Sequence, residues 1–422
     1  MSYCLSPVCR KRENPDNLDS CQSCGSKLLL KERYRTIKPI AGGGFGKTFL
    51  AMDEDMPSKQ YCVIKQFFYQ GNRDIKKAEQ LFRQEAVQLE ILGKQHSQIP
   101  KLLAHFELGS GLYLVQEFID GQDLLKSHVW DVLTVAISPD SQILASGSTD
   151  HTIKIWHLAT GKLLATKYHY IYDKKSADIH CITFSLSGKT LVSGSWCTQG
   201  ETAAIHLWKL GTMEVLQTFR GHSGWVNSTA FSPDGQILAS GGQDQTIKLW
   251  NLNTGKLINT LDKHSGPVNS IAFSPNGTIL ASGSTDTTIK IWNFATGELL
   301  NTFAEHLGSV NSVAISPDGQ ILASGSTDHT IKIWHLATGK LLKTFTEHST
   351  SVNSVTFSPN GQILASGNTD RTIKIWHLAT GELLKTFMGH SESVNSVTFS
   401  PDGQILASGS SDKTIKIWQC NC

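Results

Sequence analysis

The sequence lacks any long hydrophobic run. Nowhere in its 422 residues do about 18 apolar residues follow one another, and the first residues, MSYCLSPVCRKRENPDN, lack the apolar core of a secretory leader. These absences argue against a helical membrane protein and against an exported one. We therefore expect no membrane association and a cytoplasmic location.

An excess of charge of either sign is also missing. The chain has 38 basic and 36 acidic residues, and only 18% of its residues are charged, against roughly 25% in typical globular chains. With a net charge of +2, a nucleic-acid partner is not expected. Proline is scarce at 12 residues whereas glycine numbers 36, which favours many tight turns over a disordered or all-helical chain.

Tryptophan marks an internal repeat. Seven of the ten tryptophans recur, first after 52 residues and then every 42, at Trp156, Trp208, Trp250, Trp292, Trp334, Trp376 and Trp418. Each repeat, such as SVNSVAISPDGQILASGSTDHTIKIWHLATGKLLKTFTEH at 309–348, holds four short β-rich runs separated by turns. A period near 42 with four strands predicts stacked or radially arranged sheets.

These repeats resemble the WD-repeat β-propellers. The resemblance implies a mainly β fold, with a seven-bladed propeller over residues 122–422 whose faces bind other proteins. The last repeat, ending in TIKIWQCNC, lacks an outermost strand, and an open blade would expose a strand edge. The segment DLLKSH at 123–128 has the pattern of that strand, so we expect residues 122–127 to close the seventh blade.

The family resemblance also assigns a role to four residues of each repeat. In the family, a His before the first strand, a Ser in the second, an Asp in the next turn and the Trp of the third strand form a buried hydrogen-bonded tetrad, which stabilises only when every member is satisfied. Five repeats carry the four residues at one spacing: His222, Ser240, Asp244, Trp250; His264, Ser282, Asp286, Trp292; His306, Ser324, Asp328, Trp334; His348, Ser366, Asp370, Trp376; and His390, Ser408, Asp412, Trp418. The first repeat keeps this spacing with His128, Ser146, Asp150 and Trp156, whereas the second has Lys175 where the His belongs. Ser, His and Asp could also form a hydrolase triad, but six copies in one array favour the structural role.

Candidate contact residues lie outside the tetrads. Trp225 stands where the sister repeats have Pro or Ser, and we interpret it as an exposed contact residue. The residue after the turn Asp varies between repeats and includes Arg371 and Lys413, which are candidates for a partner surface. Neutral drift on solvated turns is the alternative explanation of that variation.

Residues 30–121 follow a different pattern, with five β-rich runs and one amphipathic helical stretch at 74–94. At IAGGGFGKTFLA and CVIK this segment resembles the N-terminal lobe of eukaryotic-type Ser/Thr protein kinases. The resemblance implies an α+β lobe in which glycines let backbone N–H groups approach the ATP phosphates. Its implied nucleotide site comprises Ile40, Gly43, Gly46, Lys65, Glu85, Glu117 and Ile119. The alternative is a glycine-rich hairpin with a surface lysine and a solvated helix.

The remaining kinase elements are absent from the sequence. H-R-D, D-F-G and A-P-E, which supply the catalytic base and hold magnesium in that family, do not occur. We therefore expect a protein-interaction scaffold with a catalytically incomplete kinase lobe, in signalling, and leave the binding of ATP and Mg²⁺ open. The alternative is an ATP-dependent Ser/Thr kinase whose catalytic lobe is supplied in trans or lost from this chain.

Four of the nine cysteines lie within the first 24 residues. Cys4, Cys9, Cys21 and Cys24 provide four thiols, and CQSCG resembles a zinc-ribbon knuckle. A closed set of four cysteines is typical of structural zinc. We expect a zinc knuckle over residues 1–28; the alternative is unpaired cysteines in a mobile tail.

Overall fold

The computed structural model describes residues 2–5, 9, 13–15, 18, 20–24, 26–43, 46–55, 61–67, 86, 102–108, 111–117, 123–124, 127–172, 175–195 and 203–420. The chain divides into two compact units. We call residues 1–120 the N-terminal unit and residues 121–420 the propeller.

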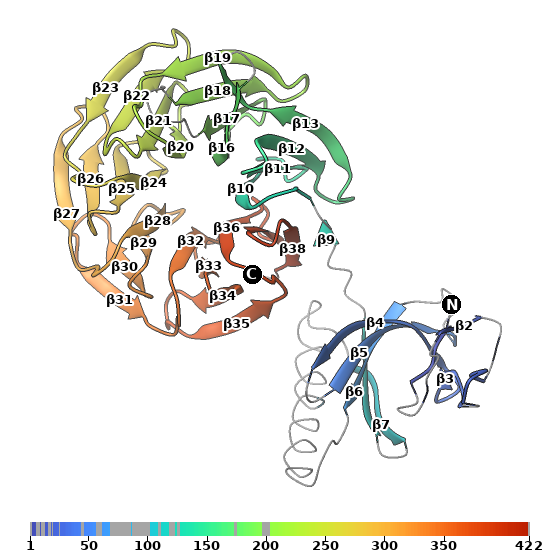
Figure 1. Cartoon of the computed structure of the whole chain (residues 1–422). Coiled ribbons are helices and arrows are strands. Elements are labelled where there is room, and N and C mark those ends of the chain that lie inside the picture. Colours follow the sequence, from blue (N-terminus) through green and yellow to red (C-terminus); the bar gives the residue numbers. More distant parts are fainter. Residues whose placement is uncertain are drawn as a thin grey trace. The chain divides into compact units, whose positions relative to one another are not determined.

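The propeller consists of seven four-stranded antiparallel sheets, or blades (Figure 1). The first strands line the middle of the ring: β10 (Val132–Ile137), β16 (Ile179–Phe184), β20 (Val226–Phe231), β24 (Val268–Phe273), β28 (Val310–Ile315), β32 (Val352–Phe357) and β36 (Val394–Phe399). The second strands are β11 (Ile143–Ser148), β17 (Thr190–Ser195), β21 (Ile237–Gly242), β25 (Ile279–Ser284), β29 (Ile321–Ser326), β33 (Ile363–Asn368) and β37 (Ile405–Ser410). The third strands are β12 (Thr152–His157), β18 (Ala204–Lys209), β22 (Ile247–Asn251), β26 (Ile289–Asn293), β30 (Ile331–His335), β34 (Thr372–His377) and β38 (Ile415–Gln419).

The outer rim is formed by the fourth strands: β13 (Leu163–Tyr168), β19 (Glu214–Arg220), β23 (Leu257–Leu261), β27 (Leu299–Phe303), β31 (Leu341–Phe345), β35 (Leu383–Met388) and, in blade seven, β9 (Asp123–Leu124). Blade one begins at β10, and the blades are numbered along the chain from there. The predicted mainly β fold with a seven-bladed propeller is confirmed.

Small residues in the second strands let neighbouring blades pack closely. A Cβ atom added at Gly283 of β25 would lie only 2.6 Å from the Cγ1 atom of Val310 in the next blade. The same close approach joins blade seven to blade one, where Gly409 meets Val132. The repeated A-S-G sequence of the second strands therefore reflects interlocking of the blades around the ring.

The seventh blade takes its outer strand from the N-terminal end of the propeller. In the short β9, Leu124 pairs with Ile415 of β38, and Asp123 pairs with Lys416. The side-chain amide of Asn395 donates a hydrogen bond of 3.0 Å to the backbone carbonyl of Val132 in blade one. These contacts join sequence segments more than 260 residues apart.

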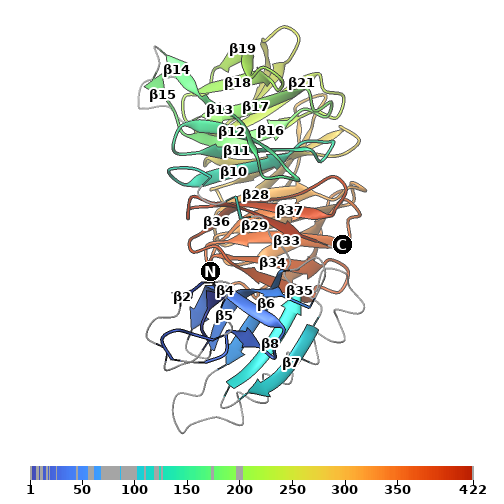
Figure 2. The ribbon, with the colours of Figure 1, turned by 90° about the vertical axis from the view of Figure 1, so that its right-hand side faces the viewer.

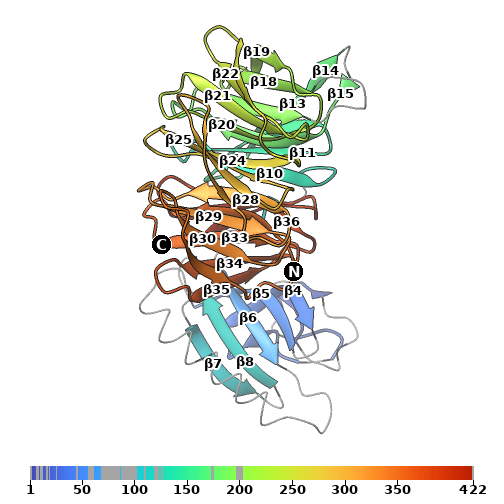
Figure 3. The ribbon, with the colours of Figure 1, turned by 90° about the vertical axis from the view of Figure 1, so that its left-hand side faces the viewer.

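Blade two carries an extra hairpin, β14 (Tyr170–Tyr172) paired with β15 (Lys175–Ser176). The hairpin connects blade one to blade two and stands out from one face of the ring (Figures 2 and 3). We call this the loop face, because on it the fourth strand of each blade connects to the first strand of the next.

The N-terminal unit contains a six-stranded sheet in the order β3-β4-β5-β6-β8-β7. Its strands are β3 (Leu29–Leu30), β4 (Tyr34–Gly43), β5 (Gly46–Asp53), β6 (Tyr61–Phe67), β7 (Leu102–Leu108) and β8 (Gly111–Glu117). The short β1 (Ser2–Tyr3) and β2 (Glu13–Asn14) pair with each other. Phe49, Ile64 and Val115 are buried in its core. The helix expected at 74–94 lies outside the described residues except for Ala86.

Candidate functional site

The tetrad of blade five forms a continuous hydrogen-bonded chain. The Trp334 indole N–H donates to the Ser324 hydroxyl oxygen over 2.9 Å, and Ser324 Oγ lies 2.7 Å from His306 Nε2. His306 Nδ1 lies 2.7 Å from Asp328 Oδ2. The same contacts occur in blades one, three, four and seven.

Burial and hydrogen bonding fix the charges of these tetrads. Burial alone would raise the pKa of Asp244, but hydrogen bonds from His222 and Thr246 outweigh it and hold the pKa at about 2. Burial lowers the pKa of His306 despite the neighbouring carboxylate, so the ring is neutral. Ser324 is 0% exposed and its oxygen already bonds to two side chains. A substrate cannot reach this hydroxyl, which favours the structural role over a hydrolase triad.

Blade six has an incomplete tetrad. His348 Nε2 lies 3.2 Å from Ser366 Oγ, but its Nδ1 is buried with no hydrogen-bond partner among the described residues. Asp370 instead accepts a hydrogen bond from Ser349. Asn368, at the position of Ser326 in blade five, donates to the backbone carbonyl oxygens of Ser366 and Thr372.

In blade two the sequence-based assignment of Lys175 to the histidine position is wrong. His169 takes that position: its Nδ1 lies 2.9 Å from Ser193 Oγ, to which the Trp208 indole also donates. The hairpin insertion lengthens the spacing from His to Ser from 18 to 24 residues, so counting back from Ser193 misses His169. A second buried histidine, His206, packs against it with ring centroids 4.2 Å apart.

The candidate contact residues lie at the turns of the blades. Arg371 and Lys413 follow the turn Asp with φ angles of 73° and 71°, in the left-handed region. Trp225 lies just before β20 with 36% of its surface exposed. Trp130, 51% exposed, occupies the corresponding connection of blade one.

The residues of the kinase-like motif are only partly described. Ile40 lies in β4, and Gly43 pairs with Gly46 where β4 meets β5. Lys65 in β6 lies between Thr48 of β5 and Leu114 of β8. Glu117 ends β8, whereas Glu85 and Ile119 lie outside the described residues. The strands thus bring Gly43, Gly46 and Lys65 into one sheet.

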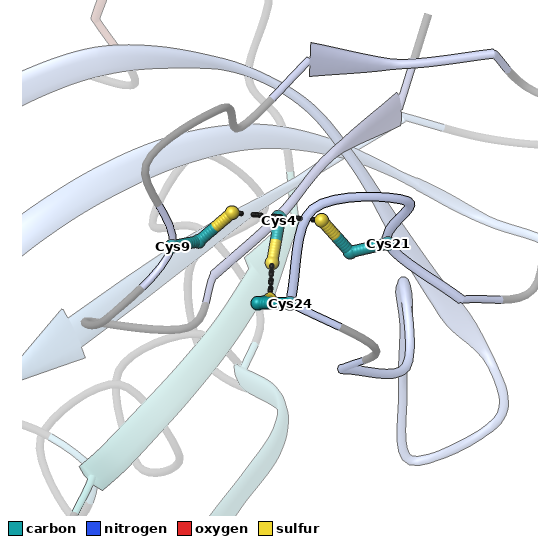
Figure 4. A group of neighbouring side chains, drawn as sticks. All are labelled: Cys4, Cys9, Cys21 and Cys24. Atoms are coloured by element: carbon teal, nitrogen blue, oxygen red, sulfur yellow. Dashed lines mark hydrogen bonds between the residues drawn. The ribbon is translucent and has the colours of Figure 1, made fainter.

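The four N-terminal cysteines converge on one point (Figure 4). Their sulfur atoms all lie within 4.8 Å of one another, with Cys4 and Cys24 3.6 Å apart and Cys9 and Cys21 3.5 Å apart. Sulfur atoms about 2.3 Å from a tetrahedral zinc ion would be roughly 3.8 Å apart, so the spacing fits that ion. Hydrogen bonds from Ser26 lower the pKa of the Cys24 thiol to about 6, which favours the thiolate that a metal needs.

Comparison with curated proteins gives two groups of relatives. One stretch of 126 residues is 41% identical to serine/threonine-protein kinase B of Synechocystis, covering 29% of this chain and 22% of the kinase. Another kinase, PknA of Nostoc, is 43% identical over 98 residues, which are 23% of this chain and 17% of the kinase. Small ribosomal subunit protein RACK1y of rice is 32% identical over 165 residues, covering 28% of this chain and 48% of that protein. The chain thus spans less than half the length of each of these relatives.

None of the described residues belongs to a helix with the length and hydropathy of a membrane span. The sequence profile of the WD domain, G-beta repeat, matches residues 122–157, 213–251, 255–293, 297–335, 339–377 and 381–419. Most of blade two falls outside these matches, as its insertion and altered tetrad would lead one to expect. The matches cover more than half of the chain, and it belongs to the WD40 repeat family.

Proposed function

We propose that this protein is a non-catalytic scaffold that binds other proteins through the faces of its propeller. The observation that carries the proposal is the use of the repeated His, Ser and Asp side chains in buried hydrogen bonds, which leaves no accessible nucleophile in the regular tetrads. The exposed parts of the blades are the connecting loops, which suit recognition of a partner. Similarity to proteins named Ser/Thr kinases supports a role in signalling.

We further propose that the N-terminal unit is a catalytically incomplete kinase lobe. Phosphoryl transfer needs magnesium ligands and a group that orients the acceptor hydroxyl, and the 422 residues lack the H-R-D and D-F-G motifs that supply them. In this unit ATP and Mg²⁺ would meet the glycine turn, Lys65, Glu85 and the other residues of the implied nucleotide site. The alternative, a kinase whose catalytic lobe is supplied in trans or lost from this chain, is favoured by the similarity to Synechocystis and Nostoc kinases.

A structural zinc ion held by Cys4, Cys9, Cys21 and Cys24 is the third part of the proposal. When bound, zinc would cross-link a segment with few apolar residues, in which Leu28 is the main buried aliphatic side chain beside the cysteines. The support is the convergence of four sulfur atoms from residues up to 20 positions apart.

Cross-linking of the full chain inside its native cells tests the scaffold proposal. Lys263 and Lys413 of the propeller and Lys27 and Lys31 of the N-terminal unit are all exposed to a lysine-reactive reagent. We expect cross-links to other proteins from the propeller lysines. Cross-links confined to Lys27 and Lys31 would contradict binding through the propeller and point to the N-terminal unit.

A further inference from the structure

The near-identity of the blades makes deviations from the repeat informative. In blades four to seven, a small residue precedes the buried Val of the first strand and an Asn follows it. In blades five and six, for example, Asn311 donates a hydrogen bond of 3.0 Å to the Val352 carbonyl, which ties neighbouring blades together. Blades one to three depart from this pattern through Asp131 and Leu133, Asp178 and His180, and Trp225.

These deviations form one continuous surface. The ring of Trp130 in blade one lies edge-on to His151, with centroids 5.8 Å apart, and His151 Nδ1 lies 2.9 Å from Asp178 Oδ1 in blade two. Asp178 and His180 are both partly exposed and flank the buried Ile179 at the start of β16. His180 then packs against Trp225 of blade three, with centroids 5.3 Å apart.

This surface on the loop face, which we call the aromatic patch, comprises Trp130, His151, Asp178, His180 and Trp225. It is apolar at both ends, because Trp130 is 51% and Trp225 36% exposed. The projecting hairpin of blade two starts beside it, where Tyr168 and Tyr170 stack with centroids 6.0 Å apart. Blades four to seven have only Gly, Pro, Ser, Thr or Glu at the positions of the two tryptophans.

Two carboxylates lie in the patch or next to it. Asp131 and Asp178 occupy equivalent positions in adjacent blades, and no Lys or Arg among the described residues forms an ion pair with either. Burial raises the pKa of Asp178, because removal from water disfavours the charged carboxylate, and a cationic partner would stabilise that charged form. The faces of exposed tryptophans also attract cations, with Arg the most frequent partner.

We propose that the aromatic patch binds an extended peptide segment of a partner protein that presents an arginine or lysine side chain flanked by apolar residues. The cation would lie near Asp178, and the apolar neighbours would pack on Trp130 and Trp225. This inference rests on the proposed scaffold function and specifies the site and chemistry of the partner.

Fluorescence titration of the full chain with three capped heptapeptides tests the proposal. The peptides share an apolar sequence and differ only in a central Arg, Gln or Glu. We expect the Arg peptide to quench tryptophan emission and to bind about tenfold or more tightly than the Glu peptide, because Arg can make both a cation–π contact and a charge pair whereas Glu can make neither. Equal affinity for the three peptides, or binding of none of them at millimolar concentration, would overturn it.

Variants locate the binding site. Trp130→Ala, Trp225→Ala and Asp178→Asn should each weaken the Arg peptide at least several-fold, whereas Leu307→Ala, at a 93% exposed position on the loop face of blade five, should not. Thermal unfolding of each variant separates lost binding from lost folding.

If instead the Glu peptide binds, and Arg371→Ala or Lys413→Ala abolishes that binding, the site lies over blades six and seven rather than at the aromatic patch. If the propeller cross-links to partners but the Arg peptide does not bind, the aromatic patch is rejected as the binding site and the scaffold proposal stands.

Discussion

Asn368 distinguishes blade six from its sister blades. Its amide donates to the backbone carbonyls of Ser366 and Thr372, while His348 Nδ1 has no partner among the described residues. Burial lowers the pKa of His348 to about 4. The contact between histidine and aspartate is thus missing in the blade that has Asn in place of Ser326, and an unsatisfied buried polar atom is costly.

Replacing Asn368 by Ser should therefore stabilise the protein. Ser326 occupies this position in blade five, where the contact between His306 and Asp328 is intact. We expect Asn368→Ser to raise the free energy of unfolding by about 1 kcal/mol, measured by urea denaturation, because His348 could then pair with Asp370. The matched control, Ser326→Asn, should lower it by a similar amount. A loss of stability in Asn368→Ser would contradict this account of blade six.

The cysteine cluster gives a second prediction at this scale. Elemental analysis should find about one zinc per chain, since four thiolates complete a closed tetrahedral site. Cys21→Ser removes one buried ligand and should release the metal, whereas Cys62→Ser, at a buried cysteine outside the cluster, should keep it. Equal zinc content in the two variants would argue against the site.

The repeat spacing predicts some side-chain contacts and misses others. The contacts of His306, Ser324 and Trp334 follow from a fixed spacing that sets strand register, and the structure brings these residues together. His169 was missed because the hairpin insertion shifts the count. Trp130 lies outside the repeated tryptophan position, but its contact with His151 depends on the turn geometry of blade one.

At the scale of elements, β9 has only two residues, yet it is the strand that closes the propeller. Leu124 pairs with Ile415 of β38, just as Phe387 of β35 pairs with Ile373 of β34 in blade six. Without β9, the edge of β38 would be open along its length. Closure of the ring therefore depends on two described residues of the segment that precedes blade one.

Truncation tests the importance of this strand. Deleting residues 1–117 leaves β9 in place and should preserve the melting temperature of the propeller. Deleting residues 1–129 removes β9 and also His128 of the first tetrad, and should lower it by several degrees. Deleting residues 1–126 separates the two losses, because it spares His128. Equal melting temperatures for the 118–422 and 127–422 chains would refute the role of β9.

The repeat pattern predicted most of the propeller strands, because each blade carries the same turn residues and the same alternation. The closing position of β9 also agrees with the expected segment at 122–127. The hairpin of β14 and β15 was not predicted, since YIYDKKS has no counterpart in the other repeats.

For the whole molecule, the repeated tetrads predict sensitivity to acid. Burial keeps His128, His264 and His306 neutral by lowering each pKa, so unfolded chains bind more protons than folded ones once the pH falls below about 6.5. Stability should be complete above that pH and decline toward pH 4. The lowered pKa of Asp244, about 2, adds a further loss between about pH 4 and pH 2.

Calorimetry at several pH values checks this expectation. The melting temperature should fall steadily from pH 7 to pH 4.5. Each histidine with a lowered pKa reduces the free energy of unfolding at low pH by about 1.4 kcal/mol per unit of that lowering. His335→Gln, which changes a turn histidine bonded to Thr338, should leave the slope unchanged. A melting temperature that is constant over this range would contradict the assignment of neutral buried histidines.

The central claim concerns what the whole molecule does: it binds partners and transfers no phosphate by itself. The most direct test incubates the purified full chain with radiolabelled ATP and Mg²⁺, beside the Lys65→Ala variant. We predict no incorporation of phosphate into the chain or into a generic protein substrate, with both proteins at background. Magnesium-dependent phosphate transfer that Lys65→Ala abolishes would contradict the scaffold account and establish the protein as a kinase.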